Sequence, residues 1–137
     1  IPMDLENSVQ VSASGLRAQA LRMRVIAENL ANADSVSASP GGQPYRRRIL
    51  TFRAELDKTS GATEVDVPSI KGDKSSFPRV YQPGNPAADA KGYVLMPNVN
   101  ALTETADMKA AQRSYEANLN AIEAARNLTL RTIDLLK

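Results

Sequence analysis

The sequence predicts an α+β fold, in which long N- and C-terminal helices pair as an antiparallel coiled coil and a small, irregular β-rich domain lies between them. Apolar residues recur at helical spacing near both ends of the chain. Residues 33–101 instead hold seven of the eight prolines and six of the seven glycines, which interrupt helices. We therefore expect an N-terminal helix within 1–36, a β-rich middle over 37–101 and a C-terminal helix within 102–137.

The N-terminal helix is predicted over residues 4–32, where no proline occurs and Gly15 is the only glycine. Larger apolar residues recur there every seven positions, and an alanine precedes three of them by three positions, as at the two seam positions of a coiled coil. Because alanine buries little area, such a helix needs a partner helix. The larger residues are Val9, Leu16, Met23 and Leu30, with Ile26 beside them, and the alanines are Ala13, Ala20 and Ala27.

Two asparagines, Asn29 and Asn32, flank Leu30 at the end of this predicted helix. A carboxamide at this place can bond to a neighbouring helix and set the register of packing, as a buried polar residue does in a coiled coil. The alternative is that both asparagines face solvent at a fraying helix end. Asn32 can also form the C-terminal cap, since asparagine tolerates the left-handed conformation.

Four short strands are predicted in the middle segment, from β-branched and aromatic residues that lie between turn signals. Pro68 and Pro78 interrupt two of them, which favours strands at sheet edges. Gly84 lies in a predicted tight loop over 82–89 and is expected to supply a positive φ there. The strands are expected within 45–52, 63–70, 77–82 and 92–97.

The C-terminal helix is predicted over residues 103–137, with Thr103 or Asn100 as its N-cap. On a helical wheel its apolar and small residues cover well over half of the circumference, whereas a surface helix needs a stripe of only about 100°. A chain of 137 residues is too short to wrap such a helix, so we expect other subunits to cover the excess. The expected packing residues are Met108, Tyr115, Asn118, Leu119, Ile122, Leu128 and Leu135.

The composition excludes several classes of chemistry. Without cysteine or histidine the chain forms no disulfide, thiolate metal site or imidazole-based catalytic group. Its net charge of +2 comes from charges spread along the chain, which leaves no nucleic-acid footprint. No apolar run approaches the roughly 20 residues of a membrane span, and no signal-peptide core is expected at the start. Met3 resembles a natural start, an expectation that leaves open whether Ile1 and Pro2 belong to the natural chain.

Several stretches of the sequence together resemble the bacterial flagellar axial proteins, the class of rod, hook and hook-associated subunits. The stretches "ASGLRAQ" (13–19), "IAENLANADS" (26–35) and "RSYEAN" (113–118) are similar to patterns shared across that class. The run "PGNPAADAKGYVLMPNVN" (83–100) resembles the proximal-rod type of basal-body rod protein within it.

The resemblance implies a structural, non-enzymatic subunit of the flagellar basal body, with no cofactor, metal or small-molecule substrate. It implies export as an unfolded chain by the flagellar type III apparatus and helical polymerisation in the periplasm, where the terminal helices build the drive shaft and export channel. The implied partners are copies of the chain, other rod proteins and the adaptor that joins the rod to the membrane ring.

Three other interpretations of the sequence remain open. The main alternative is a soluble helical binding module or adaptor that forms no filaments. Glu104 and Asp107 could instead be the acid and base of a peptidoglycan hydrolase, although the helix dipole explains them equally well. Arg46–Arg48 could contact phosphates, but a solvated face or a salt contact between subunits is favoured. The remaining acids match no calcium loop and are expected to be ordinary surface carboxylates: Asp57, Glu64, Asp66 and Asp73.

Overall fold

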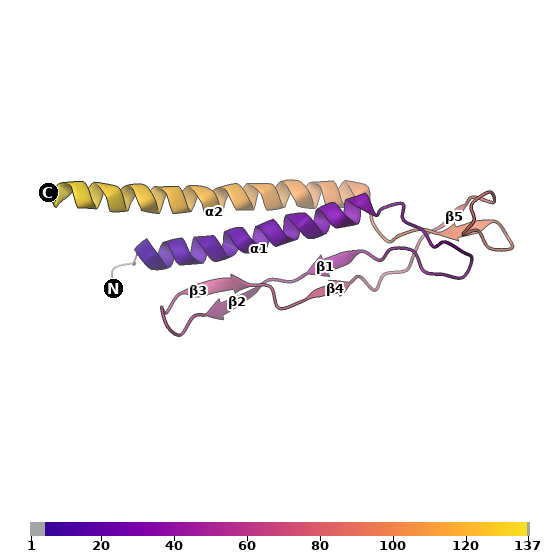
Figure 1. Ribbon diagram of the computed structural model, residues 1–137, viewed down its shortest axis with the longest axis horizontal. Helices are drawn as coiled ribbons and strands as arrows, with labels where there is room; N and C mark the ends of the chain where they lie inside the picture. Colours follow the sequence, from indigo (N-terminus) through magenta and orange to yellow (C-terminus); the bar gives the residue numbers. More distant parts are fainter. Residues whose placement is uncertain (1–4, 137) are drawn as a thin grey trace. The chain divides into compact units, whose positions relative to one another are not determined.

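The computed structural model describes residues 5–136 and has a long helix at each end with short strands between them (Figure 1). The expectation about Ile1 and Pro2 therefore concerns residues outside the described range. Along the chain the elements are α1 (Leu5–Ala31), β1 (Arg48–Leu50), β2 (Arg53–Leu56), β3 (Thr63–Asp66), β4 (Ile70–Gly72), β5 (Arg79–Tyr81), β6 (Tyr93–Leu95) and α2 (Ala101–Leu135). Neither of these two helices is long and apolar enough to span a lipid bilayer.

The chain forms two compact units, and each helix contributes to both of them. The first unit combines the described parts of residues 1–23 and 109–137 with the segment 51–69. The second combines residues 24–50 with residues 70–108. The predicted division into residues 1–36, 37–101 and 102–137 consists of consecutive segments. Each compact unit instead combines segments that are far apart in the sequence.

An asparagine caps the start of α2, and another caps the end of α1. Asn100 is the N-cap of α2, because its Oδ1 accepts hydrogen bonds from the backbone N–H groups of Leu102 (3.0 Å) and Thr103 (3.2 Å). The prediction was therefore right for Asn100 and wrong for Thr103. At the end of α1, Nδ2 of Asn32 donates to the carbonyl of Glu28 at 2.8 Å, which satisfies one of the last carbonyls of the helix.

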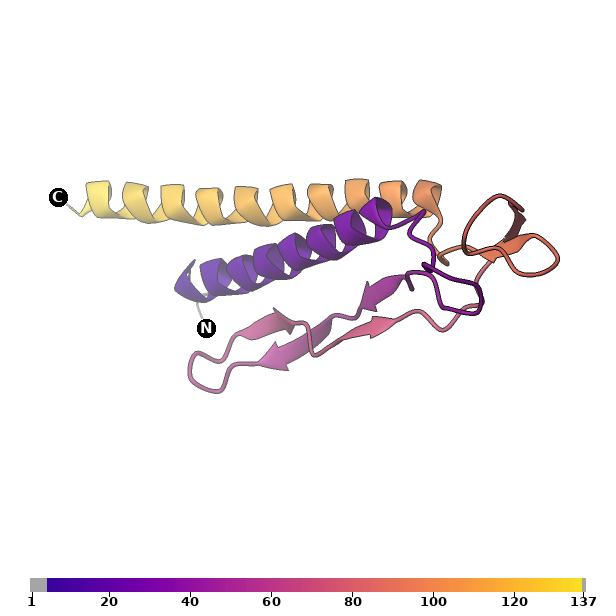
Figure 2. The same ribbon diagram turned by 45° about the vertical axis from the view of Figure 1, so that its right-hand side comes forward.

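In the first unit, α1 lies between α2 and the β2–β3 hairpin (Figures 1 and 2). The two helices run in opposite directions, as Leu5 and Val9 line one groove with Ile122 and Leu130. Further along α1, Gly15 lies so close to α2 that a Cβ atom there would be 2.8 Å from Oδ1 of Asn118. Glycine therefore permits the close approach of the two helices at this point.

The buried side of α1 differs from the predicted alanine seam. Ala20 and Ala27 are exposed, because the close contact with α2 and the strands is centred on other positions. The buried side chains of α1 lie along a neighbouring stripe: Ser14, Ala18, Val25, Ile26 and Asn29. The alanine seam is thus not the seam within this chain.

The strands pair into three antiparallel two-stranded sheets, β1–β4, β2–β3 and β5–β6. All four stretches predicted as strands contain one, whereas β2 was not predicted and β4 was missed except for Ile70. Pro68 separates β3 from β4, and these two strands pair in different sheets. Since every described sheet has two strands, each strand is an edge strand, as the prolines indicated.

The loop before β6 was predicted correctly as a tight turn but with the wrong glycine. Backbone hydrogen bonds from Asn85 to Gln82 and from Ala88 to Asn85 close it, and Gly84 does not have a positive φ. Gly92 does, with φ of 86°, and a Cβ atom there would lie 2.7 Å from the ring of Tyr81. The positive φ and the close ring both require glycine at position 92.

Candidate functional site

Asn29 joins α1 to strand β1 in the second unit by pairing with the strand backbone. Its Oδ1 accepts from the N–H of Arg48 at 3.0 Å, and its Nδ2 donates to the carbonyl of the same residue at 2.9 Å. This is the pairing that a neighbouring strand would provide, and it occupies the outward backbone groups of β1 at that position. The Tyr45 hydroxyl also donates to Oδ1 at 2.8 Å.

Asn29 is only 1% exposed, so the expectation that it faces solvent at a fraying end is wrong. Its Nδ2 also donates to Oε2 of Glu104 on α2 at 3.4 Å, so the carboxamide does bond to a neighbouring helix, which here belongs to the same chain. A buried carboxamide with these partners avoids the cost of an unsatisfied polar group. Asn32 is half-buried and caps the helix through its side chain, but not in the expected left-handed conformation, because no described residue other than glycine has a positive φ.

Arg47 holds the start of α2 to the strands of the second unit. Its guanidinium forms an ion pair with Glu104, which is fully buried, and a second one with Asp73 at 3.2 Å. Asp107 lies 3.7 Å away on the next turn of α2. Burial opposes the charge of Arg47, yet its bonds to Glu104 and Asp73 raise the guanidinium pKa above its ordinary value.

The arginine run makes contacts inside the chain, which corrects the expectation of a bare solvated face, while a salt contact between subunits stays a prediction. Arg48 pairs with Glu28 at 3.0 Å. Arg46 donates to the carbonyl of Asp73 at 2.6 Å, and its guanidinium lies 4.3 Å from the ring centre of Phe77. These contacts use the run for internal ion pairs, hydrogen bonds and stacking rather than for phosphate binding or a bare solvated face.

The same ion pairs remove the geometric basis for a hydrolase. Glu104 and Asp107 both face one arginine, whereas a glycosidase needs two carboxyl groups on opposite sides of a sugar. Within residues 5–136, no group of three or more acidic side chains is arranged to hold a metal ion.

In the first unit, three polar side chains of α1 contact the β2–β3 hairpin. Ser14 Oγ accepts from the N–H of Val65 at 3.0 Å, and Gln10 donates to the Asp57 carboxylate at 2.8 Å. Asn7 donates to the carbonyl of Ser60 at 3.1 Å. The spacing of 7, 10 and 14 places these side chains on one face of a helix. That polar face was missed, because the sequence was searched for apolar periodicity.

The predicted packing residues of α1 lie at or beside its buried side. Ile26 and Asn29 are buried. The others are half-buried: Val9, Leu16, Met23, Leu30 and Asn32.

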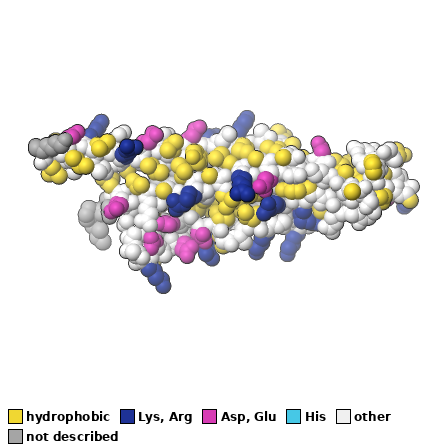
Figure 3. Space-filling view, in the orientation of Figure 1, with side chains coloured by type: hydrophobic (Ala, Val, Ile, Leu, Met, Phe, Trp, Pro, Cys, Tyr) yellow, Lys and Arg dark blue, Asp and Glu magenta, His cyan; other side chains and the backbone are white. Residues whose placement is uncertain are grey.

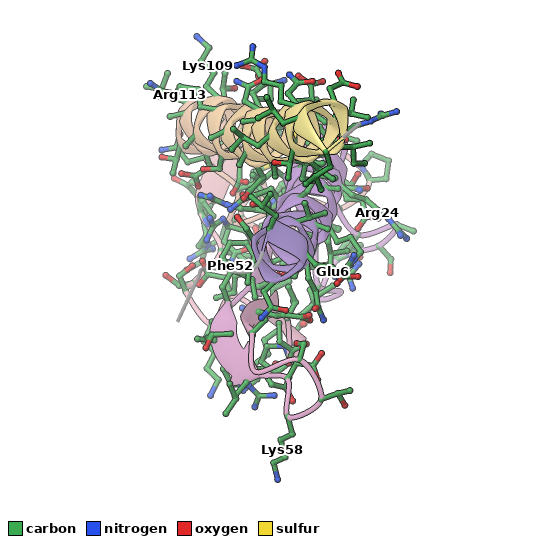
Figure 4. All side chains as sticks on the ribbon, turned by 90° about the vertical axis from the view of Figure 1, so that its left-hand side faces the viewer. Glu6, Arg24, Phe52, Lys58, Lys109 and Arg113 are labelled. Carbon is green, nitrogen blue, oxygen red and sulfur yellow. The ribbon has the colours of Figure 1, made fainter. Side chains whose placement is uncertain are left out.

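The C-terminal helix has one covered side and one exposed side. Ala111 and Ala125 are buried on the covered side, and among the predicted residues Met108, Tyr115, Asn118 and Ile122 are half-buried. The other predicted residues, Leu119, Leu128 and Leu135, are exposed by 39%, 51% and 85%. Figure 3 shows hydrophobic side chains exposed along α2, and Figure 4 shows Lys109 and Arg113 pointing away from α1.

Beyond Ala125, the described chain no longer covers α2. Every residue from 126 to 136 is exposed. The large apolar residues among them are Leu128, Leu130, Ile133, Leu135 and Leu136. In soluble proteins, several large apolar side chains exposed together mark an interaction site.

The sequence of the chain also matches known protein families. Residues 10–37 match the family described as "Flagella basal body rod protein", and residues 90–135 match "Flagellar basal body rod FlgEFG protein C-terminal". A flagellar basal-body rod protein FlgC of Agrobacterium fabrum is 50% identical over 97% of this chain and 96% of its own length. The chain belongs to the FlgC family.

Two further FlgC proteins show that the similarity spans distant bacteria. The protein of Salmonella typhimurium is 41% identical over 97% of this chain and 98% of its own length. That of Bacillus subtilis is 36% identical over 96% of this chain and 97% of its own length. The chain is accordingly a structural subunit of the flagellar rod and not an enzyme, as the resemblance implied.

Proposed function

We propose that the exposed apolar end of α2, residues 126–136, is the surface through which this FlgC-family chain assembles with neighbouring subunits of the flagellar basal-body rod. One observation carries the proposal: residues 126–136 are all exposed, although this stretch contains five large apolar side chains. Covering them on assembly would contribute roughly 25 cal/mol for each Å² removed from water.

The family and the pairing of α1 with α2 also support a proposal about how the subunits are arranged. The antiparallel α1–α2 pair supports a coiled coil in an inner domain made from 1–36 and 102–137, with 37–101 as the outer segment. The predicted packing residues that are half-buried or exposed in one copy would complete their burial against neighbours. We propose helical polymerisation, because contacts between unlike surfaces give open assemblies.

Family membership also supports proposals about the place of assembly and the route to it. The relatives are named as flagellar basal-body rod proteins. We propose that this chain takes its place in the periplasmic rod, contacts other rod proteins and the adaptor to the membrane ring, and leaves the cell through the flagellar type III apparatus.

A pair of leucine substitutions tests the assembly surface. In Leu128→Gln/Leu135→Gln both altered side chains are exposed in a single copy, so the folded chain should keep its stability. We expect this variant to lose self-association in sedimentation velocity and to fail to restore swimming in cells that lack the natural subunit. Lys109→Gln/Arg113→Gln, on the charged side of the same helix, is the matched control and should behave as the natural chain does. Normal assembly of the leucine variant would contradict the proposal.

A further inference from the structure

In each of two sheets α1 bonds to one outer edge at a single residue, and the opposite edge is left open. In the β1–β4 ladder the N–H of Asp73 donates to Arg47, and in the β2–β3 ladder the N–H of Asp57 donates to Ala62. Along an antiparallel pair, residues that bond to the partner strand alternate with residues whose backbone groups point away from it. By that alternation the backbone of Arg48 in β1 and Val65 in β3 points outward. Asn29 pairs with the first of these and Ser14 with the second.

The opposite edges have no such partner. The same alternation turns the backbone groups of Ala54 and Leu56 in β2, and of Ile70 and Gly72 in β4, away from their sheets. Within residues 5–136 no hydrogen bond reaches these outward groups. All four residues of β2 are exposed, and Leu56 is an exposed apolar side chain. Open edges of this kind are templates for a strand from another chain.

The two open edges carry opposite charge. The β2–β3 hairpin, residues 53–66, holds four acidic and two basic side chains. The segment at the β4 edge, residues 70–74, holds two basic side chains and one acidic one, and the acidic one, Asp73, already pairs with Arg47. Lys71 and Lys74 are exposed and form no ion pair within the described chain. The surplus at each edge would therefore be neutralised by the other edge.

One like-charge pair within the hairpin also indicates that a positively charged side chain from another copy would stabilise it. Glu55 and Glu64 are directly opposite each other in the β2–β3 register. Two carboxylates in this position destabilise a sheet. Arg53 lies 3.7 Å from Glu55 and is shared with Asp66 at 2.9 Å, whereas Glu64 has no ion pair in the described chain. Arg17 and Lys58 line the same groove without pairing with either glutamate.

We infer that the β2 edge of one copy pairs with the β4 edge of a second copy, with Lys71 and Lys74 beside Glu55 and Glu64. This inference rests on the proposed function, since it specifies how neighbouring copies in the rod contact each other. Because the two edges differ, each copy uses one edge toward one neighbour and the other edge toward the next. Such a contact builds an open helical assembly when the rotation between copies does not close a ring.

A charge-swap experiment tests the contact with the full chain. Lys71→Glu/Lys74→Glu makes both edges acidic, and Glu55→Lys/Glu64→Lys makes both edges basic. Alone, each variant should need about tenfold higher concentration, or more, to self-associate in sedimentation velocity. An equimolar mixture should recover the natural association, because each acidic edge then contacts a basic one. Circular dichroism of each variant verifies folding.

Hydrogen exchange shows whether strands pair or charges merely attract. In the associated chain, the amides of Ala54, Leu56, Ile70 and Gly72 should exchange at least about tenfold more slowly than in the dilute chain. Unchanged association of both charge variants, or no added protection at these amides, would overturn the inference. Protection that arises only when another rod protein is added would also overturn it and assign the edges to that protein.

The leucine variant separates this inference from the proposed function. If Leu128→Gln/Leu135→Gln abolishes association and the charge variants do not weaken it, the strand contact is wrong and the role of α2 stands. If only the charge variants weaken association, the role of α2 is wrong and the strand contact stands.

Discussion

Asn29 shows how one side chain takes the place of a missing strand. A carboxamide offers one acceptor and a donor group, as a peptide unit does, and it can pair with both backbone groups of Arg48. An aspartate would keep the acceptor, lose the donor and add a charge near Glu104, whose Oε2 lies 3.4 Å from Nδ2. Asparagine therefore suits this buried position.

Replacing Asn29 with alanine should destabilise the fold strongly. The Arg48 backbone and the Tyr45 hydroxyl would lose buried partners, and we expect a loss of about 2–4 kcal/mol in the free energy of unfolding. Urea unfolding measures the loss, and faster exchange of the Arg48 amide locates it. The exposed Asn120→Ala is the control and should change little. Equal stability of the two variants would show that the hydrogen bonds of Asn29 contribute little to stability.

The buried ion pair makes Arg47 a second sensitive position. Arg47→Ala leaves Glu104 charged and buried without its main partner, which should cost about 3–5 kcal/mol in urea unfolding. Arg47→Met/Glu104→Leu removes both charges and should recover most of that loss. Asp107→Asn, which touches only the longer contact of 3.7 Å, should have a small effect. Additive losses in the double variant would contradict this account.

At the scale of elements, α1 and α2 approach closely at Gly15. Glycine costs a helix about 1 kcal/mol relative to alanine, so Gly15→Ala would stabilise α1 if space allowed. Here the added Cβ atom would meet the side chain of Asn118 at 2.8 Å. We therefore expect Gly15→Ala to lower the melting temperature in the natural chain and to raise it in an Asn118→Ala background. The same sign in both backgrounds would show that helix contact does not decide this position.

The β5–β6 hairpin should loosen in acid because of Asp89. Hydrogen bonds from the N–H groups of Tyr93 and Lys91, together with Arg79, hold the pKa of the Asp89 carboxyl below its ordinary value. A lowered pKa means that the carboxylate stabilises the folded hairpin. That contribution is complete above the unfolded pKa of about 3.9 and is lost as pH falls through the lower folded pKa.

A pH titration followed by NMR tests this expectation at the Tyr93 amide. Its chemical shift should change below about pH 4 in the natural chain. Asp89→Asn has no carboxyl group at this site, so its Tyr93 amide should show no such step. A step of the same size in both proteins would assign the titration to another group.

At the scale of the whole molecule, the fully buried side chains are few and small. Apart from Val25, Ile26 and Val94, the buried hydrophobic residues are all alanines, so the described chain lacks a thick core. The apolar end of α2 is left uncovered. A single copy therefore buries little apolar area relative to its length, and neighbours are needed to complete the burial.

The stability of the chain should consequently depend on its concentration. In the dilute chain we expect amides in residues 126–135 to exchange far faster than those in 104–118, because the first group lies outside the covered part of α2. The melting temperature should rise with protein concentration as association stabilises the folded state. A fully helical monomer with a cooperative, concentration-independent melt would count against assembly through α2.

Local patterns in the sequence predicted the two helices, four of the six described strands, Asn100 as one of two cap candidates, and an excess of apolar surface on α2. These features depend on local periodicity, proline and glycine positions and short-range capping, all of which are visible along the chain. Only the tertiary structure decided that Asn29 and Ser14 close strand edges, that Arg47 reaches Glu104, and that Ala20 and Ala27 face outward. These hydrogen bonds and ion pairs depend on distances between residues that are far apart in sequence. The spacing of apolar residues along the chain does not predict those distances.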